Sequence, residues 1–240
     1  MVVALRGDYK LQIKNKNMIS CDTVYQKVLA LANKEQRGYI TPQEFNLFAD
    51  QAQMEIFEQY FYDLDQRFRV NSNSDEYANA RHNIQEKITI FETSDVGSTT
   101  ISSDVYRLGI INVQYLNKIC EAEEIQQKEI NNILKSPLTK PSVERPVYVR
   151  VNNEITIHPS VNQFTYNYVR RPIKPNWNYV IVNNKPLYNS STSINFELHA
   201  SEESELVYKI LKLAGINIKQ QEVVQIGQAL EANQVQQEKQ

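Results

Sequence analysis

The stretch TPQEFNLFADQAQMEIFEQYFYDLDQR (residues 41–67) decides how the first part of the chain folds. Hydrophobic side chains recur along it at three- and four-residue spacing, which predicts a helix of about six turns with one wide apolar face. Thr41 can cap this helix, Pro42 suits its first turn, and Glu44 stands where a capping box places its acid. The apolar face is formed by Phe45, Phe48, Ala52, Ile56, Tyr60 and Leu64.

The overlapping stretch NKEQRGYITPQEF (residues 33–45) also has the spacing of part of a calcium-binding loop. In an EF-hand loop that begins at Asn33, however, Arg37 would stand at position 5, where the loop needs an oxygen ligand. The helix cap explains Glu44 without a metal, and Gly38 suits the end of a preceding helix. The sequence therefore predicts a helix–turn–helix corner and no calcium site.

The remaining pattern predicts an α+β fold: an N-terminal helical hairpin-like region, a central, mostly antiparallel β region with an inserted helix, and C-terminal helices. Further helices are predicted from residue 22 to before Gly38, over 75–88 and 120–134, from Ser201 to a terminating Gly215, and over 222–234. Strands are predicted within residues 88–93, 99–116, 146–159, 163–172, 176–189 and 193–199. Asn152-Asn153 and Asn183-Asn184 supply hairpin turns, because Asn tolerates a positive φ.

These patterns divide the chain into four parts. They are an N-terminal extension (1–17), a helical region (18–97), a β-rich region (98–200) with a helix at about 120–135, and a C-terminal helical region with a polar tail (201–240).

Composition argues against several classes of protein. The 26 basic and 28 acidic residues give a formal charge of -2, so no basic excess marks nucleic acid or an anionic membrane as the main partner. Cys21 and Cys120 lie far apart and form neither a disulfide framework nor a zinc motif. No apolar run approaches the ~20 residues that span a bilayer. We expect a soluble protein made in a cytoplasm, with no membrane partner.

No pattern of residues indicates catalysis. His82, His158 and His199 are isolated, and the six glycines form no phosphate-binding loop. The acidic clusters at 121–124 and 202–205 open predicted helices, where the helix dipole favours acids. A hydrolase that uses two distant acids stays open as an alternative. We expect no enzyme, no catalytic residue, no metal and no cofactor.

The stretches YQKVLALANKEQRGYITPQEFNLFADQAQMEIFEQYF (residues 25–61) and NFELHASEESELVYKILKLAGINI (residues 195–218) resemble a group of virion structural proteins. These proteins belong to short-tailed bacteriophages, the crAss-like phages and related marine ones. The resemblance implies a ring subunit of the phage neck, the head–tail connector below the portal. Such a subunit is located in the virion, where it would join the capsid vertex to the tail and line the DNA channel.

The same resemblance implies the partners: other copies of the chain in a cyclic ring, a dodecamer, together with the portal, other neck and tail proteins, and non-specific contact with DNA in the channel. A tail, baseplate or capsid-associated structural protein is the alternative, and an adaptor outside the virion is a more distant one.

The aromatic-rich segments of the central region are predicted to form much of the subunit interface, together with the polar C-terminal tail. Tyrosine brings contact area at low entropy cost, which suits extended protein contacts. On this hypothesis, changing Tyr168 and Trp177 to Ala leaves a folded monomer that fails to join the particle. The candidate interface residues are Tyr148, Tyr166, Tyr168, Arg170, Arg171, Trp177, Tyr179 and Tyr188.

Overall fold

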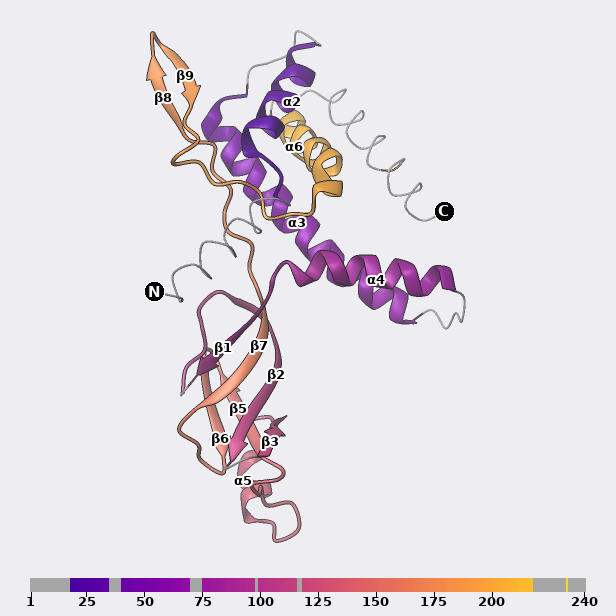
Figure 1. Ribbon diagram of the computed structural model, residues 1–240, viewed down its shortest axis with the longest axis vertical. Coiled ribbons are helices and arrows are strands. Elements are labelled where there is room, and N and C mark those ends of the chain that lie inside the picture. Colours follow the sequence, from indigo (N-terminus) through magenta and orange to yellow (C-terminus); the bar gives the residue numbers. More distant parts are fainter. Residues whose placement is uncertain are drawn as a thin grey trace, which may run out of the picture. The chain divides into compact units, whose positions relative to one another are not determined.

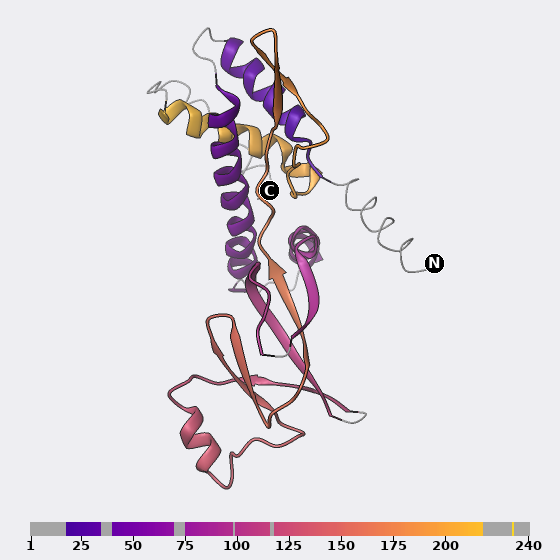
Figure 2. The ribbon, with the colours of Figure 1, turned by 90° about the vertical axis from the view of Figure 1, so that its left-hand side faces the viewer.

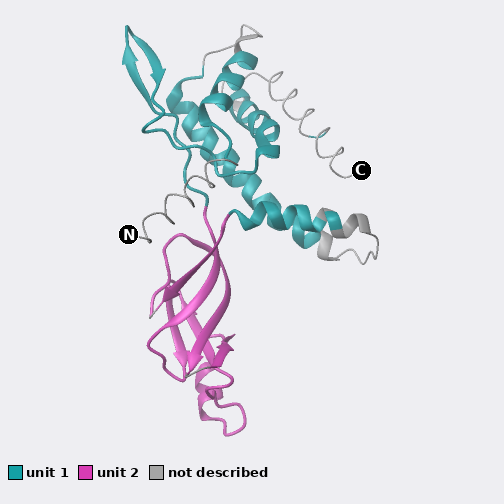
Figure 3. Ribbon diagram, in the orientation of Figure 1, with its two compact units in different colours: residues 1–90, 172–240 teal, residues 91–171 magenta. Residues whose placement is uncertain are grey.

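The computed structural model describes residues 18–34, 40–69, 75–97, 99–115, 118–217 and the single residue 232. It confirms the α+β class and divides the chain into two compact units (Figure 3). Unit 1 comprises the described residues of 1–90 and 172–240, and unit 2 comprises those of 91–171. Residues 172–200, predicted to belong to the β-rich region, thus belong to the helical unit. The predicted N-terminal extension and Gly38 lie outside the described residues, as does the helix over 222–234 apart from residue 232.

Unit 1 is built on three packed helices, which Figures 1 and 2 show in their upper parts. They are α2 (Cys21–Lys34), α3 (Pro42–Arg69) and α6 (Glu203–Asn217), with α4 (Asp75–Thr89) against α3. A 3-10 turn, η2 (Ala200–Glu202), leads into α6. Unit 1 also carries a two-stranded sheet, β8 (Tyr179–Val182) with β9 (Lys185–Tyr188).

The predicted capping box at the start of α3 is confirmed. The Thr41 backbone N–H donates to Glu44 Oε2 at 3.0 Å, and the Glu44 N–H donates to Thr41 Oγ1 at 3.3 Å. The Thr41 hydroxyl donates to the same carboxylate at 2.8 Å. These hydrogen bonds from the Thr41 backbone and side chain lower the pKa of Glu44. Glu44 is therefore explained as a helix cap.

The C-terminal helix α6 begins two residues after its predicted start at Ser201, but its predicted end is wrong. His199 precedes the first turn as its cap, and its ring accepts a hydrogen bond from the Ser201 backbone N–H at 3.3 Å. Gly215 does not terminate α6, since it lies buried inside the helix, which continues to Asn217. Packing of α6 on the unit therefore outweighs the local tendency of glycine to end a helix.

Unit 2 consists of two sheets, seen in the lower part of Figure 1. The first has the order β1-β7-β2-β3, and the second has the order β4-β5-β6. Only the short pair β4–β5 is parallel among these described strands. The strands are β1 (Glu92–Gly97), β2 (Val105–Tyr115), β3 (Lys118–Glu121), β4 (Glu123–Glu124), β5 (Val147–Val151), β6 (Glu154–His158) and β7 (Phe164–Arg170).

One core joins the two sheets of unit 2. Ile111 and Tyr166 from the first sheet and Tyr148 and Ile157 from the second belong to a single buried hydrophobic cluster. The two sheets therefore pack face to face, with alternating side chains pointing into the shared core.

The predicted helix over 120–134 is wrong for residues 120–129. Residues 118–121 pair with β2 instead, with Cys120 opposite Val113, and only α5 (Ile130–Lys135) is helical. The buried Ala122 donates its N–H to the Ile111 carbonyl at 2.8 Å, and Glu123 donates to the Pro146 carbonyl at 3.0 Å. Pairing with strands distant in sequence thus overrides the local helical pattern.

The strand predicted at 193–199 is also wrong in part. Ile194 and Phe196 form only isolated bridges, with Asn176 and Ile19 respectively. Phe196 and Leu198 are fully buried in unit 1, so this segment packs on helices rather than in a sheet.

Candidate interaction surface

The eight predicted interface residues do not form one surface. Five of them are buried by the chain itself: Tyr148, Tyr166, Tyr168, Arg170 and Trp177. Three are half-buried or exposed: Tyr179, Tyr188 and Arg171. The buried side chains stabilise the units and offer no contact area to a neighbour. Substituting Ala at both Tyr168 and Trp177 is consequently expected to unfold the chain rather than leave a folded monomer.

The buried tyrosines of unit 2 belong to its core. The Tyr166 ring is 2% exposed and stacks on Tyr168 with centroids 5.3 Å apart, while its hydroxyl accepts a hydrogen bond from the Ser102 N–H at 3.0 Å. The Tyr148 hydroxyl donates to Glu124 Oε2 at 3.2 Å. Burial and the nearby Glu124 carboxylate raise the pKa of Tyr148 to about 12.

Arg170, Arg171 and Lys174 form a basic cluster in the sequence, and the structure divides it between the two units. Arg170 is buried at the end of β7, where its guanidinium lies 5.9 Å from the Phe91 ring centroid and donates to the Arg171 carbonyl at 3.3 Å. Lys174 belongs to unit 1 and pairs with Asp50 at 3.0 Å. The cluster therefore forms no single basic site within either unit.

Trp177 is the anchor of the β8–β9 hairpin. Its indole is 2% exposed and packs on Tyr25 of α2 with ring centroids 4.4 Å apart. On the hairpin side, both Tyr179 and Tyr188 stack on it at 5.7 Å. The indole Nε1 donates to Asp22 Oδ1 at 2.9 Å. The first residues of the hairpin are thus fixed to the helical core by a stack of four aromatic rings.

Polar contacts close the base of the hairpin. The Asn189 N–H donates to the Asn178 carbonyl at 2.9 Å, and the Asn178 N–H donates to Ser193 Oγ at 3.0 Å. On the α3 side, the Trp177 N–H donates to Asn46 Oδ1 at 2.8 Å. These hydrogen bonds hold the two strands together at the base of the hairpin and join the base to α3 through Asn46.

Beyond this base, the hairpin extends away from the helices of unit 1, as Figure 1 shows. Its two-residue turn is formed by Asn183 and Asn184, whose φ angles of 51° and 59° lie in the left-handed region that a type I′ turn requires. The strand register pairs Val180 with Leu187. The predicted turn chemistry at these two asparagines is confirmed.

The tip of the hairpin is apolar on both faces. Because side chains alternate along a strand, Val180 and Val182 point to one face and Ile181 to the other. The exposed fractions are 52% for Val180, 67% for Ile181, 45% for Val182 and 53% for Leu187. Two-stranded hairpins are marginally stable in water, so apolar side chains on such an arm indicate a surface that another protein covers.

One sequence pattern is consistent with this exposed hairpin, but it is not sufficient to predict it. The run YVIV (residues 179–182) is apolar at consecutive positions, which is typical of a strand buried on both faces. The fold decides the pairing: among the described strands, β8 and β9 pair only with each other, so no other described strand extends their sheet.

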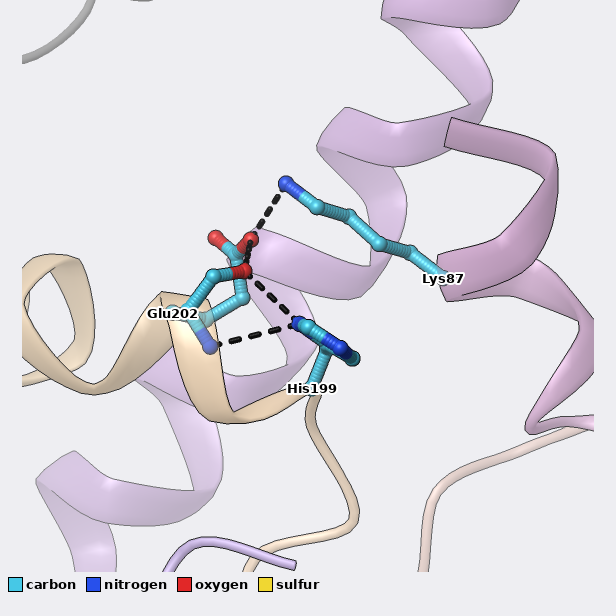
Figure 4. A network of polar contacts seen from close by, with 4 residues as sticks. Lys87, His199 and Glu202 are labelled. Carbon is cyan, nitrogen blue, oxygen red and sulfur yellow. Dashed lines mark hydrogen bonds and ion pairs between the residues drawn. The ribbon is translucent and has the colours of Figure 1, made fainter. Parts of the chain in front are cut away.

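A second candidate site is the polar network between α4 and η2 (Figure 4). Lys87 Nζ lies 2.5 Å from Glu202 Oε1, and the Glu202 side chain is almost completely buried. Ser201 Oγ donates to the same carboxylate at 3.0 Å and lies 2.9 Å from His199 Nδ1. The buried carboxylate is compensated by one cation and one hydroxyl, an arrangement that holds α4 against the start of α6.

This network borders a hollow of about 430 Å³ in unit 1. Its charged lining is mainly acidic, with Asp63, Glu86, Glu202 and Glu205 beside Lys87. Among the described residues, no group of three or more His, Cys, Asp or Glu side chains is placed to hold a metal ion. Lys87, His199, Ser201 and Glu202 pair with one another, and we assign this network to stability.

Comparison with models of known protein families finds no match, and comparison with curated proteins finds no match. Within the part of the chain that the structure describes, no helix is both long and apolar enough to cross a membrane. The β8–β9 hairpin is therefore the candidate functional feature, and its assignment depends on its own geometry.

Proposed function

We propose that this chain is a structural subunit of a bacteriophage particle that forms a ring in the neck, below the portal. In this role it joins the capsid vertex to the tail, lines the DNA channel, and contacts further copies of itself, the portal and other neck proteins. The observation that carries the proposal is the anchored β8–β9 hairpin, whose apolar tip is exposed on both faces. Such an arm is suited to insertion into a neighbouring subunit.

The energetics of the arm support a permanent partner. Burying apolar surface contributes roughly 25 cal/mol per Å². In the single chain, Val180, Ile181, Val182 and Leu187 remain 45–67% exposed and gain only part of this free energy, although they belong to an element anchored on the helices. A subunit of a closed assembly recovers that free energy when a neighbour covers the tip, and it needs no enzymatic pocket to do so.

The resemblance to neck proteins supports the same role. The two resembling stretches, residues 25–61 and 195–218, are far apart in sequence. Their described residues supply most of α2, the first part of α3, and α6, the three helices that pack together in unit 1. The resemblance thus covers one packed body, the body from which the hairpin extends.

Quantitative peptide mass spectrometry on purified particles tests the proposal, with the portal subunit as internal standard. We expect a stoichiometry equal to that of the portal, about twelve copies for a dodecameric ring. Hundreds of copies per particle would assign the chain to the shell or to a tail tube. Absence from particles, with the chain present in infected cells, would overturn the proposal in favour of an adaptor.

A further inference from the structure

Unit 2 contains a groove that differs in composition from the rest of the surface. It has a volume of about 560 Å³ and lies at one end of the β1-β7-β2 part of the sheet, beside the loop at 160–163. Val96, Thr165 and Asn112, which the strand register places across these three strands, all line it. Of the described residues that line it, none is Asp, Glu, Lys, Arg or His.

The groove offers hydrogen-bonding groups and apolar contacts in place of charge. Carboxamides come from Asn112, Gln114, Asn162 and Gln163, and apolar side chains include Val96 and Val161. Charged residues make up 22% of the chain, so a lining of this size would contain about two if it were an average surface. An uncharged groove suits an uncharged occupant, because a charged side chain would lose its hydration there without gaining a partner.

The β8–β9 hairpin of unit 1 has matching chemistry. Its ten residues, 179–188, contain one charged side chain, Lys185. Its apolar tip ends in the carboxamides of Asn183 and Asn184, which can exchange hydrogen bonds with the amides of the groove. Pro186 lacks an N–H, so the edge of β9 is blunted against strand pairing, and the tip is suited to side-chain docking.

We propose that the hairpin tip of one copy docks in the unit 2 groove of a second copy. One surface is a projecting arm, the other is hollow, and both are almost free of charge. Because the two surfaces differ, the contact is heterologous: each copy uses its hairpin toward one neighbour and its groove toward the other. Contacts of this kind close into rings when the rotation permits. The choice of a second copy as occupant rests on the proposed ring function.

Cysteine cross-linking of the recombinant full chain tests the contact. All chains carry Cys120→Ser, which leaves only the buried Cys21. One chain also carries Ile181→Cys at the hairpin tip, and another carries Val96→Cys in the groove. We expect a disulfide-linked heterodimer when the two are mixed under mild oxidation, none from either chain alone, and a ladder of oligomers from the double variant.

The matched control is Ile119→Cys, at a more exposed position of the same sheet outside the groove. Equal cross-linking of Ile181→Cys to positions 119 and 96 would overturn the proposal, as would no cross-linking at any concentration. Homodimers from Ile181→Cys alone would also overturn it, since they indicate a symmetric hairpin–hairpin contact. Ile181→Lys is expected to weaken self-association roughly thirtyfold, as for a central interface residue.

The cross-link requires no other viral protein, so its outcome is separable from particle stoichiometry. If the chain cross-links as expected but is absent from particles, the proposed contact is supported and the proposed neck function is overturned. If the chain is present at portal stoichiometry but fails to cross-link, only the proposed contact is overturned.

Discussion

The indole Nε1 of Trp177 donates a hydrogen bond of 2.9 Å to Oδ1 of Asp22, across 155 positions of sequence. This bond joins the first turn of α2 to the segment from which the β8–β9 hairpin starts. Because Trp177 also packs between Tyr25 and the two tyrosines of the hairpin, one side chain connects the helical core to the proposed arm.

Replacing Trp177 should therefore destabilise unit 1 as a whole. We expect Trp177→Ala to lower the free energy of unfolding by about 3–5 kcal/mol, as for other buried aromatic truncations. Trp177→Phe, which keeps a ring but loses the bond to Asp22, should cost less. Urea denaturation followed by circular dichroism measures both. Ile181→Ala at the exposed tip is the control, expected to change stability by no more than about 0.5 kcal/mol. Equal stability of Trp177→Ala and this control would contradict the anchoring role.

Gln53 is a second linking side chain, fully buried in α3. Its Nε2 donates to the Ile173 carbonyl at 2.9 Å, and its Oε1 accepts from the Glu197 N–H at 3.1 Å. We expect Gln53→Leu to lower the free energy of unfolding by about 1–3 kcal/mol for each backbone group that loses its hydrogen bond to Gln53, namely the Ile173 carbonyl and the Glu197 N–H. Gln51→Leu, on the exposed side of the same helix, is the matched control and should be nearly neutral. Thermal unfolding of both variants distinguishes them, and similar melting temperatures would refute the assignment.

The raised pKa of Tyr148 predicts a loss of stability at alkaline pH. Its folded pKa of about 12 exceeds the ordinary value of 10.0, so folding favours the protonated phenol. The corresponding stability is fully present below pH 10 and falls as the pH rises toward 12, because only the unfolded chain then releases the proton readily. We expect Tyr148→Phe to weaken this pH dependence. Urea midpoints at several pH values measure it, and an unchanged slope would exclude Tyr148 as the cause.

The two thiols should differ in reactivity. Burial, with a smaller contribution from Asp22, raises the pKa of Cys21 to about 12, whereas Cys120 is half-buried in β3. The thiolate is the reactive form, so we expect Cys120 to react first with a disulfide reagent and Cys21 to react only on unfolding. Absorbance kinetics on Cys120→Ser and Cys21→Ser chains separate the two sites. Rapid labelling of native Cys120→Ser would show that unit 1 opens easily.

Elements fixed by neighbouring residues could be predicted. The capping box at Thr41 and Glu44, the repeat of apolar side chains along α3, and the turn at Asn183-Asn184 all depend on residues within a few positions of each other. Their hydrogen bonds and φ angles are set locally, so the sequence was sufficient for them.

The candidate site was predicted only in part. The aromatic segments include the hairpin that we propose as a contact, but the predicted residues Trp177, Tyr179 and Tyr188 form its anchor rather than its exposed tip. A tyrosine at an interface and one in a core have the same local pattern. Burial, which depends on the whole fold, distinguishes them.

The sequence by itself determined the α+β class, the extent of α3 and the turn at Asn183-Asn184. Only the tertiary structure decided that residues 118–121 and 123–124 are strands, that Gly215 lies inside a helix, and that the apolar tip of β8–β9 is exposed. The physical reason is the separation in sequence between the residues that stabilise each element. Caps and turns gain their stabilisation within one turn of chain, whereas strand pairing and burial gain it from residues brought together by folding.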